Sequence, residues 1–202
     1  CRGEWGSIKK YNHKTNGNLR GYKSELWEGG HRVPFIIRWP GKIKNGETNT
    51  ELICQIDLMK TIAEITGYEL PENSCVDSYS IIPALTQKND FTVREALVHH
   101  AGNGSFAIRK GKWKLILTNK SGGWVSEYLN PNGLGITTPW QLYNIEIDIE
   151  EKNNVYEKHP EIVKDLKSLL TKYISEGRST PGRTLQNDSI DFEWKQIGFI
   201  NE

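Results

Sequence analysis

The sequence predicts an α/β segment followed by a small α+β unit. Three features of the 202-residue chain lead to this prediction. Residues 33–39 form a continuous apolar run, which is typical of a strand buried on both faces. Several short segments after residue 95 have the alternation of antiparallel strands, and residues 160–175 have helical spacing. We therefore expect residues 1–95 to end an α/β domain and residues 96–202 to form an α+β subdomain with an irregular tail.

The composition supports a folded core and excludes some classes of partner. Hydrophobic residues make up 36% of the chain and include 7 Trp, 8 Tyr and 5 Phe. A formal net charge of +1 argues against nucleic acid or an anionic membrane as partner. No apolar run is long enough for a transmembrane helix. The start at Cys1-Arg2-Gly3 lacks the pattern of a signal peptide and suggests a fragment or a processed chain.

Three cysteines show no spacing typical of a zinc site. Cys54 and Cys75 could form a disulfide in an oxidising compartment, or they could be two separate buried thiols. The sequence leaves both possibilities open.

The first half has one predicted strand and one predicted helix. We expect residues 1–20 to be an exposed loop, Val33–Trp39 to be a strand and Asp57–Thr66 to be a helix ended by Gly67. The helix has an apolar stripe made of Ile56, Met59, Ile62, Ala63 and Ile65.

The second half is predicted to be a small sheet covered by a helix. The predicted strands are Ala96–His100, Phe106–Arg109, Trp113–Leu117 and Trp140–Ile145, with a turn at Lys110-Gly111. On the third strand, Trp113, Leu115 and Leu117 should share one face. The helix Pro160–Ser175, ended by Gly177, should place its apolar face on this sheet. We expect Phe192, Trp194 and Phe199 to anchor the tail.

Residues 21–34 contain the most informative motif, Lys23 followed by Glu28-Gly29-Gly30 and Arg32. Glycines permit a tight turn where a Cβ atom would clash. Arg32 can pair with Glu28 and brace the loop, so we interpret these two residues as structural support. A lysine held in such a loop is a point charge with three donors, suited to an oxyanion. Lys23 is therefore our candidate catalytic and substrate-binding residue, and the alternative is a solvated surface charge.

Two histidines and three aromatic residues are weaker candidates for substrate contact. His99 and His100 end a predicted strand, and alternation sends their rings to opposite faces. One of them could bind substrate, or both could be hydrogen-bonded residues at the end of a strand. Trp124, Tyr128 and Trp140 could stack on sugar rings, but packing onto the core is the favoured interpretation. For His31 we expect a structural role.

The motif at Lys23 resembles a signature of the type I sulfatases, the formylglycine-dependent enzymes of the alkaline-phosphatase-like superfamily. Further segments resemble the same family in the same order: Val33–Gly41, Asp57–Ile62, Asp77–Leu85, Phe106–Leu115, Gln141–Asn144 with Asp148, Glu151 and Asn154, and Gly177–Gly182. The chain departs from the family pattern at Lys60, Ser78 and Ile149, where proline, glycine and proline are common.

This resemblance implies a fold and a reaction. The fold would be the C-terminal part of an alkaline-phosphatase-like sulfatase, α/β with a small antiparallel sheet and helix as its C-terminal subdomain. The complete enzyme would hydrolyse a sulfate monoester. Its substrate would be a sulfated small molecule or glycan, with a sulfated carbohydrate favoured, and Lys23 would contact the sulfate group. The family's location is periplasmic or secreted.

Cys1, Cys54 and Cys75 are not followed by the family's nucleophile pattern, Cys/Ser-x-Pro-x-Arg, and the family's calcium-binding aspartates are also missing. Gly3 would be the last residue of one calcium motif. The resemblance therefore implies a C-terminal fragment that is inactive alone, with calcium bound in the full-length enzyme and none in this chain.

The sequence permits two alternative functions and self-association of the fragment. A non-catalytic carbohydrate-binding module is disfavoured by the strand Val33–Trp39, which needs neighbouring strands. A phosphatase or phosphodiesterase of the same superfamily is disfavoured by the Lys-x4-Glu-Gly-Gly-x-Arg run. An uncovered strand edge also predicts self-association of the fragment.

Overall fold

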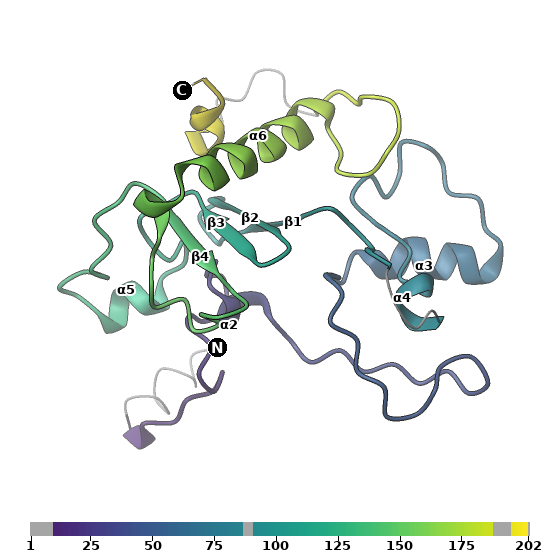
Figure 1. Cartoon of the computed structure of the whole chain (residues 1–202), viewed down its shortest axis with the longest axis horizontal. Coiled ribbons are helices and arrows are strands. Elements are labelled where there is room, and N and C mark those ends of the chain that lie inside the picture. The colour runs from purple at the N-terminus through teal and green to yellow at the C-terminus, as the bar shows by residue number, and fades with distance from the viewer. Residues whose placement is uncertain (1–9, 87–90, 188–194, 202) are drawn as a thin grey trace. The chain divides into compact units, whose positions relative to one another are not determined.

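The computed structural model describes residues 10–86, 91–187 and 195–201, which belong to two compact units (Figure 1). The first, here called the sheet unit, combines Cys1–Pro34, Val98–Lys167 and Lys195–Glu202. The second unit combines Phe35–Leu97 with Ser168–Trp194. One boundary, at Leu97, lies close to the predicted division at residue 95. The units interleave along the chain, and the assignment of residues 1–95 to a catalytic domain stays a prediction.

A four-stranded sheet with the order β1-β2-β3-β4 confirms the predicted strands. They are β1 (Leu97–His100), β2 (Phe106–Lys110), β3 (Trp113–Ile116) and β4 (Gln141–Asn144). Antiparallel pairing places Lys110 opposite Trp113 and Leu115 opposite Leu142. Gly111 has a φ of 55°, in the left-handed region that a tight hairpin turn requires. The predicted turn at Lys110-Gly111 is therefore confirmed.

The central strand β3 is buried on both faces. Lys114, Leu115 and Ile116 are each 0% exposed. One face of the sheet packs against the 26–27 segment, in a cluster of Leu26, Trp27, Ala107, Ile116, Tyr143 and Ile145. Alternation puts Lys114 on the same face as Ile116, so a lysine side chain lies inside the protein.

The long helix α6 (Pro160–Glu176) confirms the predicted helix and ends at Gly177, with a φ of 63°. Its first half belongs to the sheet unit (Figure 1). There Lys167 lies over the Trp140 ring, and His159, just before the helix, packs on Trp113. These contacts place the first half of α6 beside Trp113 of β3 and beside Trp140, which precedes β4.

Shorter elements complete the sheet unit. They are α2 (Glu28–His31), α5 (Val125–Leu129) and two 3-10 helices, η1 (Tyr156–Lys158) and η2 (Lys195–Asn201). Phe199 of η2 is buried and meets the rings of Phe106 and Trp140 edge-on. The tail is thus anchored by Phe199 as predicted. Phe192 and Trp194 lie outside the described residues.

The second unit contains α3 (Asp57–Thr66), which confirms the predicted helix, and α4 (Ile82–Thr86). Gly67 ends α3 with a φ of 70°. Asp57, at the start of α3, is fully buried and pairs with the guanidinium of Arg94. Its carboxylate also accepts the backbone N–H groups of Cys54 at 2.8 Å and Tyr79 at 2.9 Å. This carboxylate therefore ties three separate segments to the helix.

Both cysteines of this unit, Cys54 and Cys75, are free thiols. Of the two possibilities left open by the sequence, separate thiols are the one observed. Cys54 lies beside Asp57, and burial raises the pKa of its thiol to about 11.

The predicted strand Val33–Trp39 is wrong for this structure. The segment has no regular secondary structure, and Val33, Phe35 and Ile36 are 56%, 44% and 92% exposed. A strand is stable only when a neighbour pairs with its backbone, and none of the described strands pairs with this segment. The boundary between the two units, at Pro34 and Phe35, also falls within it.

The apolar stripe of α3 is correct in position but mostly exposed. Ile56, Met59, Ile62 and Ile65 are between 48% and 57% exposed, and only Ala63 of the predicted stripe is buried. Periodicity identified the helix correctly, but burial requires a covering element. Over the residues described, no helix combines the length and the apolar composition needed to cross a lipid bilayer.

Asp57→Asn should destabilise the second unit by about 3 kcal/mol, because it leaves the Arg94 guanidinium buried without a counter-charge. Glu47→Gln is the matched control, since Glu47 pairs with Lys44 at 3.0 Å but both side chains are at least half exposed. That change should cost less than about 1 kcal/mol. Chemical denaturation of both variants is the measurement, and equal losses would contradict the prediction.

Candidate functional site

Lys23 lies at the tip of a tight turn in the sheet unit, with an exposed side chain. The N–H of Glu25 donates to the carbonyl of Tyr22 at 2.9 Å, and Ser24 has a φ of 78°. In return the N–H of Tyr22 donates to the Glu25 carboxylate at 2.9 Å. The turn that carries Lys23 is thus closed by two hydrogen bonds between the same two residues.

Glu25 ties this turn to helix α5, a role that the sequence did not reveal. Its carboxylate is buried and accepts the backbone N–H of Ser126 at 2.7 Å and the Ser126 hydroxyl at 2.6 Å. Burial raises the pKa of Glu25, although the hydrogen bonds from Ser126 and Tyr22 oppose the rise. No local pattern distinguishes Glu25 from an exposed acid, because its partner lies 101 residues away.

Glycines 29 and 30 allow the one-turn helix α2 to press against this loop. A Cβ atom on Gly30 would lie 2.1 Å from the carbonyl oxygen of Glu25. One on Gly29 would lie 2.5 Å from the carbonyl oxygen of Gly21. Both distances are too short for any side chain, so the two glycines are required by close backbone approach.

A buried ion cluster anchors α2 to the sheet. The ammonium of Lys114 lies 3.0 Å from Oε1 of Glu28, 2.9 Å from Oε1 of Glu151 and 3.1 Å from Nε2 of His31. The backbone N–H of Glu28 donates to Oε2 of Glu151 at 2.6 Å. Lys114, Glu28 and Glu151 are at most 2% exposed. One lysine of β3 therefore joins α2 to the segment that follows β4.

Three arginines lie around this cluster. Arg32 pairs with Oε2 of Glu28 at 3.3 Å, the pairing that the sequence suggested, and Arg109 lies 3.6 Å from the same atom. Arg20 donates to the backbone carbonyl of Glu151 at 2.7 Å and stacks on the Trp27 ring. The Arg32 side chain is 53% exposed, so the buried Lys114 is the stronger partner of Glu28.

The cluster shifts the pKa values of its acids in opposite directions. Burial opposes ionisation of Glu28, but the charge and hydrogen bond of Lys114, with a smaller contribution from Arg109, together lower the pKa of Glu28 below its usual range. For Glu151 burial prevails and raises the pKa, with Lys114 opposing. Burial lowers the pKa of His31 to about 4, and the Lys114 charge adds to the effect. His31 is thus neutral at neutral pH.

The histidine candidates lie on opposite faces of β1, as alternation predicted. The His99 ring stacks on His31 with centroids 3.8 Å apart, which places it next to the Lys114 cluster. The His100 ring packs on Phe106 at 4.1 Å. The structure therefore brings His99, Glu28 and Arg32 into one neighbourhood and places His100 against the opposite side of the sheet.

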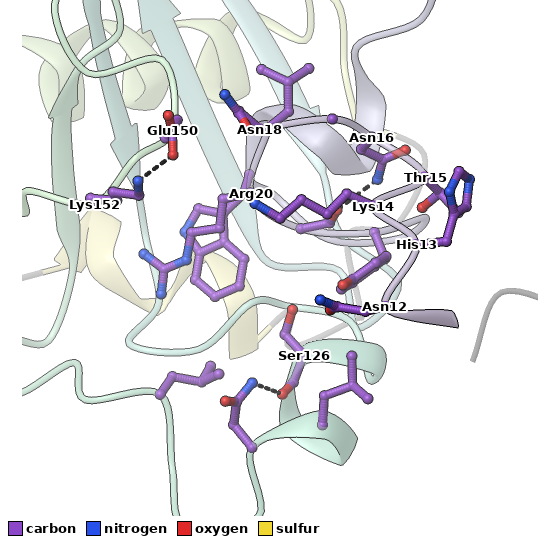
Figure 2. Close-up of a pocket in the computed structure, with 18 of the residues that line it drawn as sticks. Asn12, His13, Lys14, Thr15, Asn16, Asn18, Arg20, Ser126, Glu150 and Lys152 are labelled. Atoms are coloured by element: carbon purple, nitrogen blue, oxygen red, sulfur yellow. Dashed lines mark hydrogen bonds and ion pairs between the residues drawn. The ribbon is translucent and has the colours of Figure 1, made fainter. Parts of the chain in front are cut away.

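A pocket of about 520 Å³ opens beside the Lys23 turn (Figure 2). Its wall is formed largely by residues 12–22, which include Tyr22, and by residues from α5 onward. Lys14, Arg20 and Lys152 contribute cationic side chains, with Glu150 paired to Lys152 (Figure 2). The sequence predicted an exposed loop here and did not reveal that the loop encloses a pocket.

The described residues do not supply a metal centre. Within residues 10–86, 91–187 and 195–201, no group of three or more His, Cys, Asp or Glu side chains is arranged to hold a metal ion. Calcium in the full-length enzyme, with ligands outside this chain, stays a prediction.

Lys114→Met should destabilise the sheet unit by about 3–5 kcal/mol, because it leaves two carboxylates buried without their cation. Lys112→Met is the matched control, since Lys112 is exposed in the hairpin turn two residues away. Denaturant titration followed by near-ultraviolet circular dichroism measures both changes. A loss below about 1 kcal/mol in Lys114→Met would show that the cluster does not hold the unit together.

The contribution of His31 to the stability of the sheet unit should decrease as the pH falls from 6.5 to about 4. His31 has its folded-state pKa near 4 and a reference value of 6.5, so in this window the unfolded chain binds the additional proton. His31→Asn should have a flatter pH profile, whereas His13→Asn, at an exposed position, should retain the wild-type profile. Identical slopes for the wild type and His31→Asn would refute the assignment.

Comparison with known proteins identifies related sequences. A family model described as "N-sulphoglucosamine sulphohydrolase, C-terminal" matches residues 22–125, more than half of the chain. An N-acetylgalactosamine-6-O-sulfatase from Bacteroides thetaiotaomicron is 39% identical over 158 residues, covering 78% of this chain and 30% of the relative. A human steryl-sulfatase is 33% identical over 118 residues, covering 58% of this chain and 19% of the relative. The chain thus spans less than a third of either relative.

Solved structures agree with this relationship. One, from work on the metabolism of multiple glycosaminoglycans by Bacteroides thetaiotaomicron, is 34% identical with a TM-score of 0.67 and covers 82% of this chain and 34% of that one. The PsFucS1 sulfatase from Pseudoalteromonas sp. is 24% identical with a TM-score of 0.64 and covers 77% of this chain and 32% of that one, a likeness of fold alone. This chain therefore belongs to the sulfatase family and has the C-terminal part of its alkaline-phosphatase-like fold.

Proposed function

We propose that this chain is the C-terminal part of an enzyme that hydrolyses sulfate monoesters, and that Lys23 binds the sulfate group. The observation that carries this proposal is the support beneath an exposed lysine. Glu25 closes the Lys23 turn, two glycines press α2 against it, and Lys114 anchors α2 to the sheet. A surface lysine without a function does not require such support.

The chemistry explains why the position of Lys23 should be fixed. When the S–O bond of a sulfate ester breaks, negative charge develops on the leaving oxygen. A cation already placed near that oxygen stabilises the transition state without a reorganisation cost. A lysine ammonium is a compact charge with three donors, which suits the tetrahedral array of sulfate oxygens.

The other parts of the reaction belong to residues outside this chain. None of the three cysteines begins a Cys/Ser-x-Pro-x-Arg motif from which a formylglycine nucleophile could form. The spacing occurs once, at Ser179-Thr180-Pro181-Gly182-Arg183, in the segment after α6 that resembles the C-terminal end of the family. Calcium would be bound by residues outside this chain. The role of this chain is to bind and orient the substrate, and we expect the isolated fragment to be inactive.

A sulfated sugar is the proposed substrate class. The relative matched over most of this chain acts on a 6-O-sulfated N-acetylgalactosamine by its name, and it is 39% identical. The steryl-sulfatase resemblance covers less of the chain at lower identity. The pocket that includes Tyr22, the residue before Lys23, carries Lys14, Arg20 and Lys152 in its lining, which suits an anionic polyhydroxylated ligand. By the same kinship we propose a periplasmic or secreted location.

In the intact enzyme, Lys23→Ala should lower kcat by roughly two to three orders of magnitude, as expected for loss of a preorganised charge contact. The melting temperature should change little, because Lys23 is exposed and its removal leaves no cavity. Lys23→Arg should not restore full activity, since a planar guanidinium differs in shape from an ammonium.

The measurement is kcat for a sugar sulfate together with thermal unfolding. Lys112→Ala removes another exposed lysine of the sheet unit and should retain normal kcat. A near-normal kcat in Lys23→Ala would show that Lys23 is a solvated charge. A faster turnover of a phosphate monoester than of any sulfate would favour the phosphatase alternative.

A further inference from the structure

We propose that the indole of Trp124 is a stacking surface for the sugar ring of the substrate, beside the Lys23 turn. This inference rests on the proposed function for the role of Lys23. Trp124 directly precedes α5, in the sheet unit, and 50% of it is exposed. Trp27, in the neighbouring loop, is 1% exposed and hydrogen-bonds Gln141 within the core. The two tryptophans therefore differ in role: Trp27 belongs to the core, and half of Trp124 is accessible to a ligand.

Glycine 102 shows that the indole lies close to Ser24, the residue that follows Lys23. A Cβ atom on Gly102 would lie 2.9 Å from Cζ3 of Trp124 and 3.0 Å from Cβ of Ser24. The N–H of Gly102 also donates to the carbonyl of Ser24 at 2.9 Å. Ser24 belongs to the turn that carries Lys23, so the indole and this turn both lie next to Gly102. A sugar ring on the indole would bring its sulfate substituent within the neighbourhood of Lys23.

The loop that carries Trp124 is held against the lysine turn on several sides. The carbonyl of Ser121 accepts the N–H of Leu26 at 2.9 Å, and the carbonyl of Gly122 accepts the N–H of Asn103 at 3.1 Å. Just after Trp124, the N–H and hydroxyl of Ser126 donate to the buried carboxylate of Glu25. The position of Trp124 relative to Lys23 is thus fixed before any ligand binds.

Two further glycines make this close approach possible. A Cβ atom on Gly122 would lie 2.4 Å from Cβ of Ala101, and one on Gly123 would lie 2.6 Å from Cγ of Glu25. Larger residues at either position would displace the 121–126 loop from the lysine turn. The two glycines that precede Trp124 therefore let its loop contact the lysine turn, and the large ring follows them directly.

The ligand class follows from the chemistry of an exposed indole next to a cation. One face of a pyranose ring presents C–H groups, and stacking them on an aromatic face removes apolar surface from water. The hydroxyl groups stay at the rim, and an anionic substituent can reach the ammonium. A sulfated sugar can contact the Trp124 indole and the Lys23 ammonium at once, whereas an inorganic sulfate or a small alkyl sulfate would contact only Lys23.

The experiment measures kinetics of the intact enzyme with N-acetylgalactosamine-6-sulfate and binding of the unsulfated sugar. Trp124→Ala should raise KM about tenfold with kcat changed by less than about twofold, because the ring binds ground state and transition state alike. Trp124→Phe, which keeps an aromatic face, should recover most of the affinity. Tyr128→Ala is the matched control, because Tyr128 is 52% exposed and lies on α5, the short helix that directly follows Trp124.

Saturation-transfer NMR with N-acetylgalactosamine provides a readout that does not need hydrolysis. Saturation transfer from the protein to the C–H protons of the sugar ring should be lost in Trp124→Ala. It should be retained in Tyr128→Ala and Trp124→Phe. Unchanged KM and unchanged transfer in Trp124→Ala, or an equal loss in Tyr128→Ala, would overturn the proposal. Loss of sugar binding in Trp124→Ala together with normal kcat in Lys23→Ala would support the stacking surface and refute the proposed role of Lys23.

Discussion

The ammonium of Lys114 is the interaction on which the sheet unit depends. It comes from a central strand and is in contact with two carboxylates from segments far apart in the sequence, Glu28 and Glu151. Burying three ionisable groups is costly unless each is paired and hydrogen-bonded. Here the N–H of Glu28 and the nearby His31 supply the additional contacts. The cluster therefore specifies one position of α2 on the sheet, because any shift would leave a buried charge without its partner.

Close backbone packing extends this constraint from α2 to the Lys23 turn and the Trp124 loop. Gly29 and Gly30 allow α2 to touch the turn, while Gly122 and Gly123 allow the second loop to do the same. The Glu25 carboxylate joins both loops through Tyr22 and Ser126. Glycine contacts and a buried acid thus transmit the rigidity of the sheet to an exposed lysine.

The two lysines Lys114 and Lys23 show how location decides the role of one residue type. Lys114 is buried and paired with two carboxylates, so its charge is neutralised inside the protein and stabilises the fold. Lys23 is exposed at the tip of its turn, where an anionic ligand can reach its ammonium. In the proposed function, the first lysine provides the rigidity that makes the second effective, since a cation stabilises a transition state best when it is already in place.

The sequence alone determined the local elements and the family. The alternation in the Trp113 strand, the spacing of the α3 and α6 helices, and glycines at helix ends are short-range patterns, and each predicted an element that the structure contains. The motif around Lys23 identified the sulfatase family and the glycine turn. Only the tertiary structure decided that Lys114 and Glu25 are buried, because their partners lie 86 and 101 residues away. It also decided that Val33–Trp39 is irregular, since an apolar segment becomes a strand only where another strand pairs with its backbone.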